Sequence, residues 1–100
     1  MEKVIAILTH KGALSNDLQN NTTINLFKMN GENIVEVENI KLENTCHNEF
    51  SMLMTTKEVS MIYAETMSKD LQDVLEKLDI KTKCKEEMDN DDFINQFIFA

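Results

Sequence analysis

The chain has 100 residues, and its 42% apolar content suits one small folded domain rather than a disordered chain. It has no proline, two glycines and no arginine, and its formal net charge is −8. An acidic surface without arginine repels a phosphate backbone and lacks the bidentate donor that reads base edges, so nucleic acid is excluded as a partner. We expect a single domain over residues 1–100.

The apolar runs and the cysteines indicate the cellular compartment of the protein. The first apolar run, Val4–Leu8, is too short for a membrane span or a signal-peptide core. Cys46 and Cys84 show no C-x-x-C spacing, and nothing in the pattern supports a disulfide between them. We predict a cytoplasmic protein with reduced thiols and no membrane association.

The first half of the chain predicts three strands. Val4–Leu8 is continuously apolar, as in a strand buried on both faces. Thr9–Asn21 is polar and is interpreted as a loop. Thr22–Met29 and Glu32–Leu42 are rich in β-forming residues, and Asn30-Gly31 between them predicts a hairpin with a type I′ turn.

The second half predicts helices and two further strands. Phe50, Leu53 and Met54 fall at helical spacing and indicate a short helix. Val59–Ala64 is an apolar strand, and Ser68–Asp79 is an amphipathic helix that begins at a serine cap. Its apolar stripe consists of Leu71, Val74, Leu75 and Leu78.

The chain closes on a strand and a helix. Ile80–Cys84 alternates with lysines, which indicates a half-exposed strand at a sheet edge. Phe93, Ile94, Phe97 and Ile98 predict a last helix. The strand–helix–strand unit makes the sheet partly parallel, and short right-handed connections favour the strand order 3-2-1-4-5 with the second strand antiparallel. We predict an α/β fold of the ribonuclease H-like type, with a five-stranded mixed sheet and three helices in three layers.

In this topology the carboxyl ends of four strands share one edge, and the strand order reverses between the first and the fourth. Ligands bind at such a switch point in open α/β sheets. The residues that we expect to bind a cofactor there are His10, Cys46, His47, Glu65 and Thr66. Imidazole and thiolate are ligands for zinc, iron and iron–sulfur clusters, so His10, Cys46 and His47 are the candidate metal ligands. The plainer alternative is a pair of solvated loop histidines.

Catalysis has less support in the sequence. Cys46 as a nucleophile needs His47 or His10 as its base, and no oxyanion donor is identifiable. Ribonuclease H-type chemistry needs carboxylates for two metal ions, beginning with one in the first strand, and Val4–Leu8 has none. Cys84 is interpreted as a core residue. We predict that the protein is not an enzyme.

The order of the predicted elements resembles the dinitrogenase iron–molybdenum cofactor biosynthesis family. The residues that carry this resemblance are Lys3–Ile7, Thr23–Gly31, Met61–Ala64, Leu71, Leu75, Leu78, Ile80, Lys81 and the closing Asp92–Phe99. The family consists of small ribonuclease H-like domains that carry or insert nitrogenase metal clusters. The resemblance therefore implies an accessory role in nitrogen fixation with an iron–sulfur or iron–molybdenum-type cluster, held by the Cys46-His47 pair that matches the family's His- and Cys-containing loop.

The chain departs from the family pattern at two places. It has Ser15–Gln19 where the family commonly has a His-Phe-Gly-type segment, and Glu65-Thr66 where the family often has a Gly-Gly turn. These departures motivate a second hypothesis, a divergent member that acts only through protein–protein contacts. Its protein partner, or a second copy in a homodimer, would meet the edge of the strand Glu32–Leu42 or the acidic surface near Glu86–Asp92.

Overall fold

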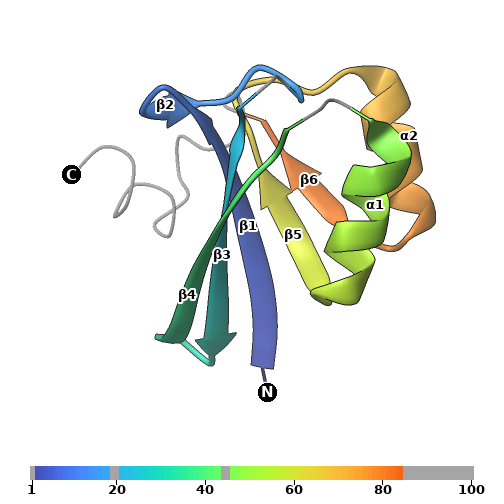
Figure 1. The fold of residues 1–100 in the computed structure, drawn as a ribbon. Helices are drawn as coiled ribbons and strands as arrows, with labels where there is room; N and C mark the ends of the chain where they lie inside the picture. Colours follow the sequence, from blue (N-terminus) through green and yellow to red (C-terminus); the bar gives the residue numbers. More distant parts are fainter. Residues whose placement is uncertain (1, 19–20, 44–45, 85–100) are drawn as a thin grey trace.

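The computed structural model of the protein describes residues 2–18, 21–43 and 46–84, which form one twisted sheet with two helices packed against it (Figure 1). The described elements, in chain order, are β1 Glu2–His10, β2 Ala13–Leu14, β3 Thr23–Asn30, β4 Asn33–Lys41, α1 His47–Thr56, β5 Val59–Tyr63, α2 Lys69–Lys77 and β6 Lys81–Lys83.

The sheet has the order β4-β3-β1-β5-β6, and the short β2 pairs with β1 outside this path. β3 runs antiparallel to both β1 and β4, whereas β5 is parallel to β1 and β6 is parallel to β5. This confirms a mixed α/β fold and the predicted order of the five longer strands, with one of them antiparallel.

The prediction of five strands is wrong by one, because the segment interpreted as a loop contains β2. Lys11 and Gly12 both have positive φ, 53° and 82°, as a two-residue type I′ turn requires, and they pair His10 with Ala13. A lysine at the first central position of such a turn gives little signal in the sequence.

The hairpin between β3 and β4 is confirmed, but its turn differs from the prediction. Asn30 pairs with Asn33, so Gly31 and Glu32 occupy the centre of the turn, and of these two only Gly31 has positive φ, at 67°. Glycine at the first central position is the type II′ pattern. A register shift follows between Lys28 and Met29, which bulges β4 near its start.

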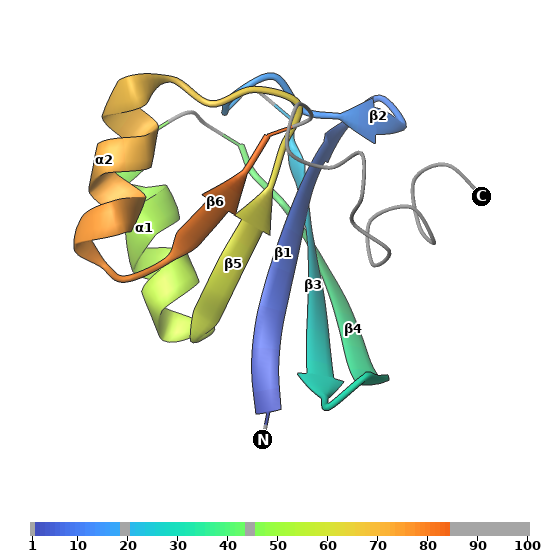
Figure 2. The same ribbon diagram turned by 180° about the vertical axis from the view of Figure 1, so that it is seen from behind.

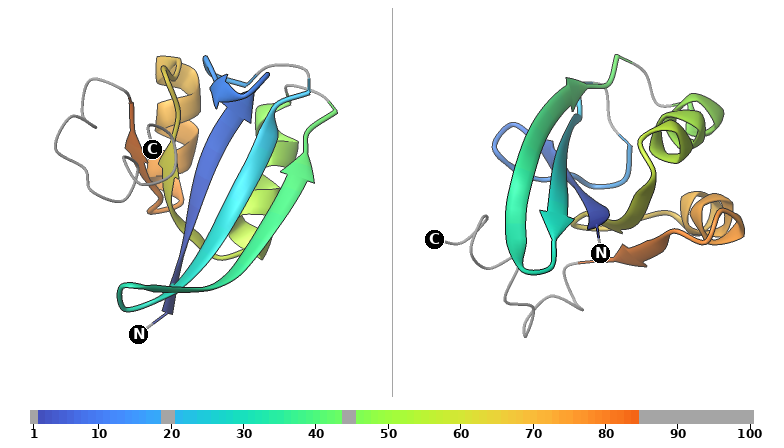
Figure 3. Two further views of the ribbon diagram at one scale, coloured as in Figure 1. Left: turned by 90° about the vertical axis from the view of Figure 1, so that its left-hand side faces the viewer. Right: turned by 90° about the horizontal axis from the view of Figure 1, so that it is seen from below.

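Both helices cover the same face of the sheet, as Figure 3 shows in its right-hand view. Ala6 and Leu8 of β1 point to this face and pack with Phe50 of α1 and Leu71 of α2. The alternate residues Ile5 and Ile7 belong to a second cluster on the opposite face. β1 is therefore buried on both sides, as its apolar run predicted.

The caps of α2 follow from its sequence. The Ser68 Oγ accepts a hydrogen bond from the Leu71 N–H at 3.2 Å, which confirms the predicted N-cap. The helix ends in a Schellman motif, in which the Ile80 and Asp79 N–H groups donate to the Leu75 and Glu76 carbonyls, both at 3.0 Å.

Three predicted features of the helices need correction or lie outside the described residues. Leu78, expected in the buried stripe of α2, is 41% exposed because it is the C-cap and the chain turns away there. His47, expected in a loop, is the first residue of α1, and Cys46 is its N-cap. The predicted last helix, Phe93–Ile98, and with it the third layer, falls outside the described residues.

Candidate functional site

The carboxyl ends of β1, β4, β5 and β6 lie at one edge of the sheet, because these strands run in the same direction. The order reverses between β1 and β5, so the predicted switch point exists. Figure 2 shows the segment after β2 crossing this edge above the ends of the strands.

The chain itself fills the switch point. The Ser15 N–H donates to the Leu8 carbonyl of β1, and the Glu65 N–H after β5 donates to the Ser15 carbonyl, both at 2.8 Å. The Asp17 N–H then donates to the Thr66 carbonyl at 2.8 Å. Ser15 is fully buried, and its Oγ donates to the Asp17 carbonyl at 2.7 Å. The backbone groups that a ligand would meet in this crevice are therefore bonded to residues 15–17.

The predicted ligands lie along this edge, but the described structure does not group them as metal ligands. Within residues 2–18, 21–43 and 46–84, no group of three or more His, Cys, Asp or Glu side chains is placed to hold a metal ion. His10 stands at the β1–β2 turn, whereas Cys46 and His47 begin α1 after β4. Because β3 separates β1 from β4, two strand spacings of about 4.8 Å each lie between them at the sheet.

The remaining predicted residues are engaged in structure. Glu65 is half-buried, and the exposed Thr66 donates its hydroxyl to the Asn16 Oδ1 at 3.2 Å. Cys46 and Cys84 form no disulfide with each other, and Cys84 packs against the helix-side core, as expected of a core residue. His10 Nδ1 is buried and has no hydrogen-bond partner among the described residues.

Two hollows of the described surface lie away from the switch point. One, with a volume of about 450 Å³, lies between α2 and β6. Another, with a volume of about 290 Å³, lies between the end of α1 and the β3–β4 hairpin. The residues that line this second hollow are Val4, Leu26, Lys28, Glu36, Glu38, Thr56, Lys57 and Glu58.

The β4 strand, next to this second hollow, is an open edge of the sheet. It spans nine residues, pairs with β3 on one side only within the described chain, and is exposed at every position except the half-buried Ile40. Val35 and Val37 are 54% and 53% exposed. Edge strands are commonly protected by charges or bulges, and β4 has a bulge and two glutamates beside its exposed valines.

One hydrogen bond just beyond the end of β4 determines which of its backbone groups point away from β3. The Leu42 N–H donates to the Thr22 carbonyl at 2.8 Å, which directs the backbone of residue 42 toward β3. Bonding direction alternates along an antiparallel strand, so Ile40, Glu38 and Glu36 also face β3. Val37, Asn39 and Lys41 direct their N–H and C=O groups outward. We call these three residues the open edge.

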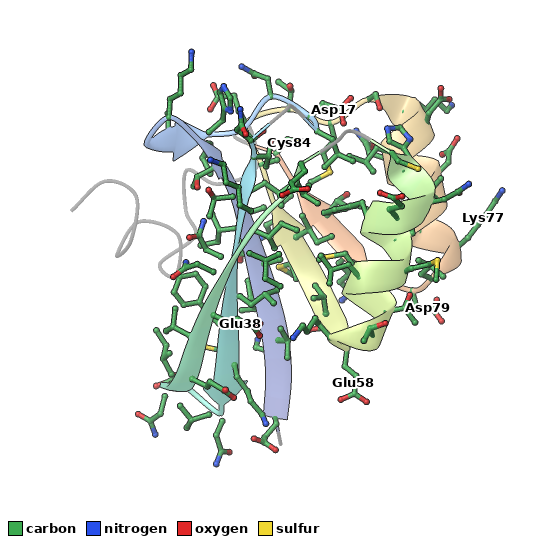
Figure 4. All side chains as sticks on the ribbon, viewed as in Figure 1. Asp17, Glu38, Glu58, Lys77, Asp79 and Cys84 are labelled. Carbon is green, nitrogen blue, oxygen red and sulfur yellow. The ribbon has the colours of Figure 1, made fainter. Side chains whose placement is uncertain are left out.

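Both faces of the sheet hold β4 in place. On the helix face, the Lys57 Nζ at the end of α1 lies 3.1 Å from the Glu38 Oε2. On the other face, the Asn39 Nδ2 donates to the Asn25 Oδ1 at 2.6 Å, and Asn25 donates to the Ile7 carbonyl at 2.9 Å. Figure 4 labels Glu38 on β4 and Glu58 at the turn after α1. These contacts join β4 to α1 and to β3.

Comparison with known proteins reveals a likeness of fold. No protein-family model matches the chain, and no curated protein matches it. A solved structure, described as the crystal structure of PH0822, superposes with a TM-score of 0.69 over 81% of this chain and 75% of that one, at 12% identity. At this identity the likeness defines the class of fold, a mixed α/β sheet with helices.

None of the described helices is long and apolar enough to cross a membrane.

Proposed function

We propose that this protein is a non-enzymatic binding domain that acts through contacts between its open edge and another protein chain. One observation carries the proposal: β4 is a long edge strand with exposed valines and outward backbone groups, held in place from both faces. Addition of a strand to such an edge is a recurring mode of recognition, in which main-chain hydrogen bonds supply affinity.

The finer fold assignment is part of this proposal. The order β4-β3-β1-β5-β6, with β3 alone antiparallel among these five, is the order of the ribonuclease H-like fold and supports that assignment. The resemblance to the dinitrogenase iron–molybdenum cofactor family remains a prediction, and so does the cytoplasmic location. Within that family this chain would be a divergent member, because backbone hydrogen bonds join its Ser15–Asp17 segment to Glu65-Thr66.

A metal or iron–sulfur cluster at Cys46, His47 and His10 also remains a prediction. Binding there needs the three side chains to converge, and in the described ranges they form no such group. The filled switch point also leaves little room beside the strand ends. Protein contact is therefore the better-supported function.

A capture experiment tests the proposal. The native protein, Val37→Pro and Asp73→Lys are immobilised, and the retained proteins are identified, purified and tested for rebinding. Proline at Val37 removes an outward N–H without breaking a bond to β3, so we expect it to lose partners that the native protein and the α2 variant retain. Circular dichroism checks that all three proteins are folded.

Two results together would contradict the proposal. The first is retention of the same partners by the native protein and by Val37→Pro. The second is stoichiometric metal in protein purified without oxygen, which the double variant Cys46→Ala, His47→Ala loses. That combination would instead support the cluster-binding hypothesis.

A further inference from the structure

We propose that the open edge binds an extended peptide segment in which basic and apolar side chains alternate. This inference rests on the proposed function and names the chemistry of the partner.

The two faces of β4 differ in chemistry. Glu38 pairs with Leu26 and Glu36 with Lys28, so both carboxylates lie on the helix face of the sheet. Val37 pairs with Phe27 and lies on the opposite face. Side chains of an added strand lie beside those of its neighbour on the same face, where opposite charges and apolar pairs are stabilising. A matching strand therefore has basic residues toward the helix face and apolar residues between them.

The hollow beside β4 extends this match on the helix face. Glu36, Glu38 and Glu58 line it together with Lys28 and Lys57, which leaves one carboxylate in excess, and Val4 and Leu26 supply apolar surface. Lysine and arginine lay apolar stems on such surface while their charged ends stay near carboxylates and water. Glu38 already has one lysine partner in this chain, Lys57. At longer range, the chain's net charge of −8 attracts a basic segment.

The same charges disfavour one register of pairing with a second copy of this chain. In a twofold antiparallel pairing of two β4 strands centred on Val37, Glu36 of one copy stands opposite Glu38 of the other. Like charges directly opposite each other destabilise a strand pair. A basic partner strand avoids the repulsion that a second copy adds in this register.

Peptide binding to the native protein provides the test. Three heptapeptides are titrated by NMR: alternating Lys/Val, alternating Glu/Val, and a Lys/Val peptide of the same composition with the lysines grouped. We expect the alternating Lys/Val peptide to bind most tightly and to shift the amide signals of Val37, Asn39 and Lys41. The Glu/Val peptide should not bind.

Two double variants with the same change in charge separate a specific contact from general attraction. Glu36→Lys, Glu38→Lys alters the wall of the hollow, and Asp73→Lys, Glu76→Lys alters exposed residues of α2. We expect the first to weaken peptide binding about tenfold and the second less than about twofold, because only close charge pairs contribute strongly. Equal weakening by both variants, or equal binding of the grouped peptide, would overturn the inference.

Failure of the inference is distinguishable from failure of the proposed function. If captured partners depend on Val37 but the alternating Lys/Val peptide does not bind, the partner chemistry is wrong and the binding edge stands. If sedimentation shows a dimer that Val37→Pro dissociates, the occupant is a second copy, and the peptide proposal is overturned. If neither partner nor peptide responds to Val37→Pro, both proposals fail.

Discussion

At the scale of single residues, Ser15 closes the edge where a ligand was expected. It is fully buried, its Oγ donates to the Asp17 carbonyl, and its backbone bridges Leu8 of β1 to Glu65 after β5. The sequence offers no local signal for this role, because serine in a polar segment usually indicates a solvated loop. Only the long-range pairing of backbone groups reveals that the crevice is filled.

Removing this hydroxyl should destabilise the fold. Ser15→Ala leaves the Asp17 carbonyl without the Oγ donor of a part-buried hydrogen bond, so we expect the free energy of unfolding to fall by about 1–2 kcal/mol. Urea unfolding measures it. Asn16→Ala, which removes an exposed contact with Thr66, is the control and should cost less than about 0.5 kcal/mol. Equal losses in the two variants would show that the Ser15 hydroxyl contributes no more to stability than the exposed Asn16–Thr66 contact.

Asp79 is a second residue with a notable backbone conformation, one that favours glycine. It has a φ of 59° at the position after the C-cap of α2, where helices favour glycine. Asp79→Gly should raise the free energy of unfolding by about 0.5–1 kcal/mol, because it relieves a left-handed conformation. Asp73→Gly, inside the same helix, should instead lower it by a few tenths of a kcal/mol. Destabilisation by Asp79→Gly would contradict the assigned turn.

At the scale of elements, the periodic segments were predictable and the turns were not. Leu71 and Leu75 mark α2 at helical spacing, and both are fully buried. Asn30-Gly31 located the hairpin, but the pairing register moved the turn by one residue and changed its type. β2 was missed because its turn begins with Lys11, a residue rarely chosen for positive φ.

The candidate site shows the same limit. Sequence spacing placed His10, Cys46 and His47 at one edge of the sheet, which the topology supports. Sharing an edge does not fix a distance, because intervening strands and the start of a helix separate the side chains. The alternation of Glu36 and Glu38 with Val35 and Val37 was visible in the sequence. This alternation supports a binding surface only because β4 is an edge strand, which the sequence alone did not establish.

Proline substitutions along β4 test which backbone groups face outward. Val37→Pro should keep the free energy of unfolding within about 1 kcal/mol of the native value, because its N–H points away from β3. Glu38→Pro removes an N–H that bonds to β3 and should cost about 2–3 kcal/mol. Thermal or urea unfolding compares the two. A greater loss at Val37 than at Glu38 would show that the Val37 N–H, and not the Glu38 N–H, bonds to β3.

At the scale of the whole molecule, the sheet has a protected centre and an open side. Within residues 2–18, 21–43 and 46–84, β1 is paired along both edges and buried on both faces, whereas β4 is paired along one edge and largely exposed. We expect amide hydrogen exchange to be slowest in β1 and fast at the open edge, with Glu38 and Ile40 slower than Val37 and Asn39. Uniform exchange along β4 would contradict the open edge.

The most direct test of strand addition at the open edge is amide exchange of the native protein with and without the alternating Lys/Val peptide. Strand addition predicts that the peptide slows exchange at Val37, Asn39 and Lys41 and leaves the amides around Cys46 and His47 unchanged. Binding that leaves the open edge unprotected, or that protects the edge near His10 and Cys46 instead, would contradict the central claim.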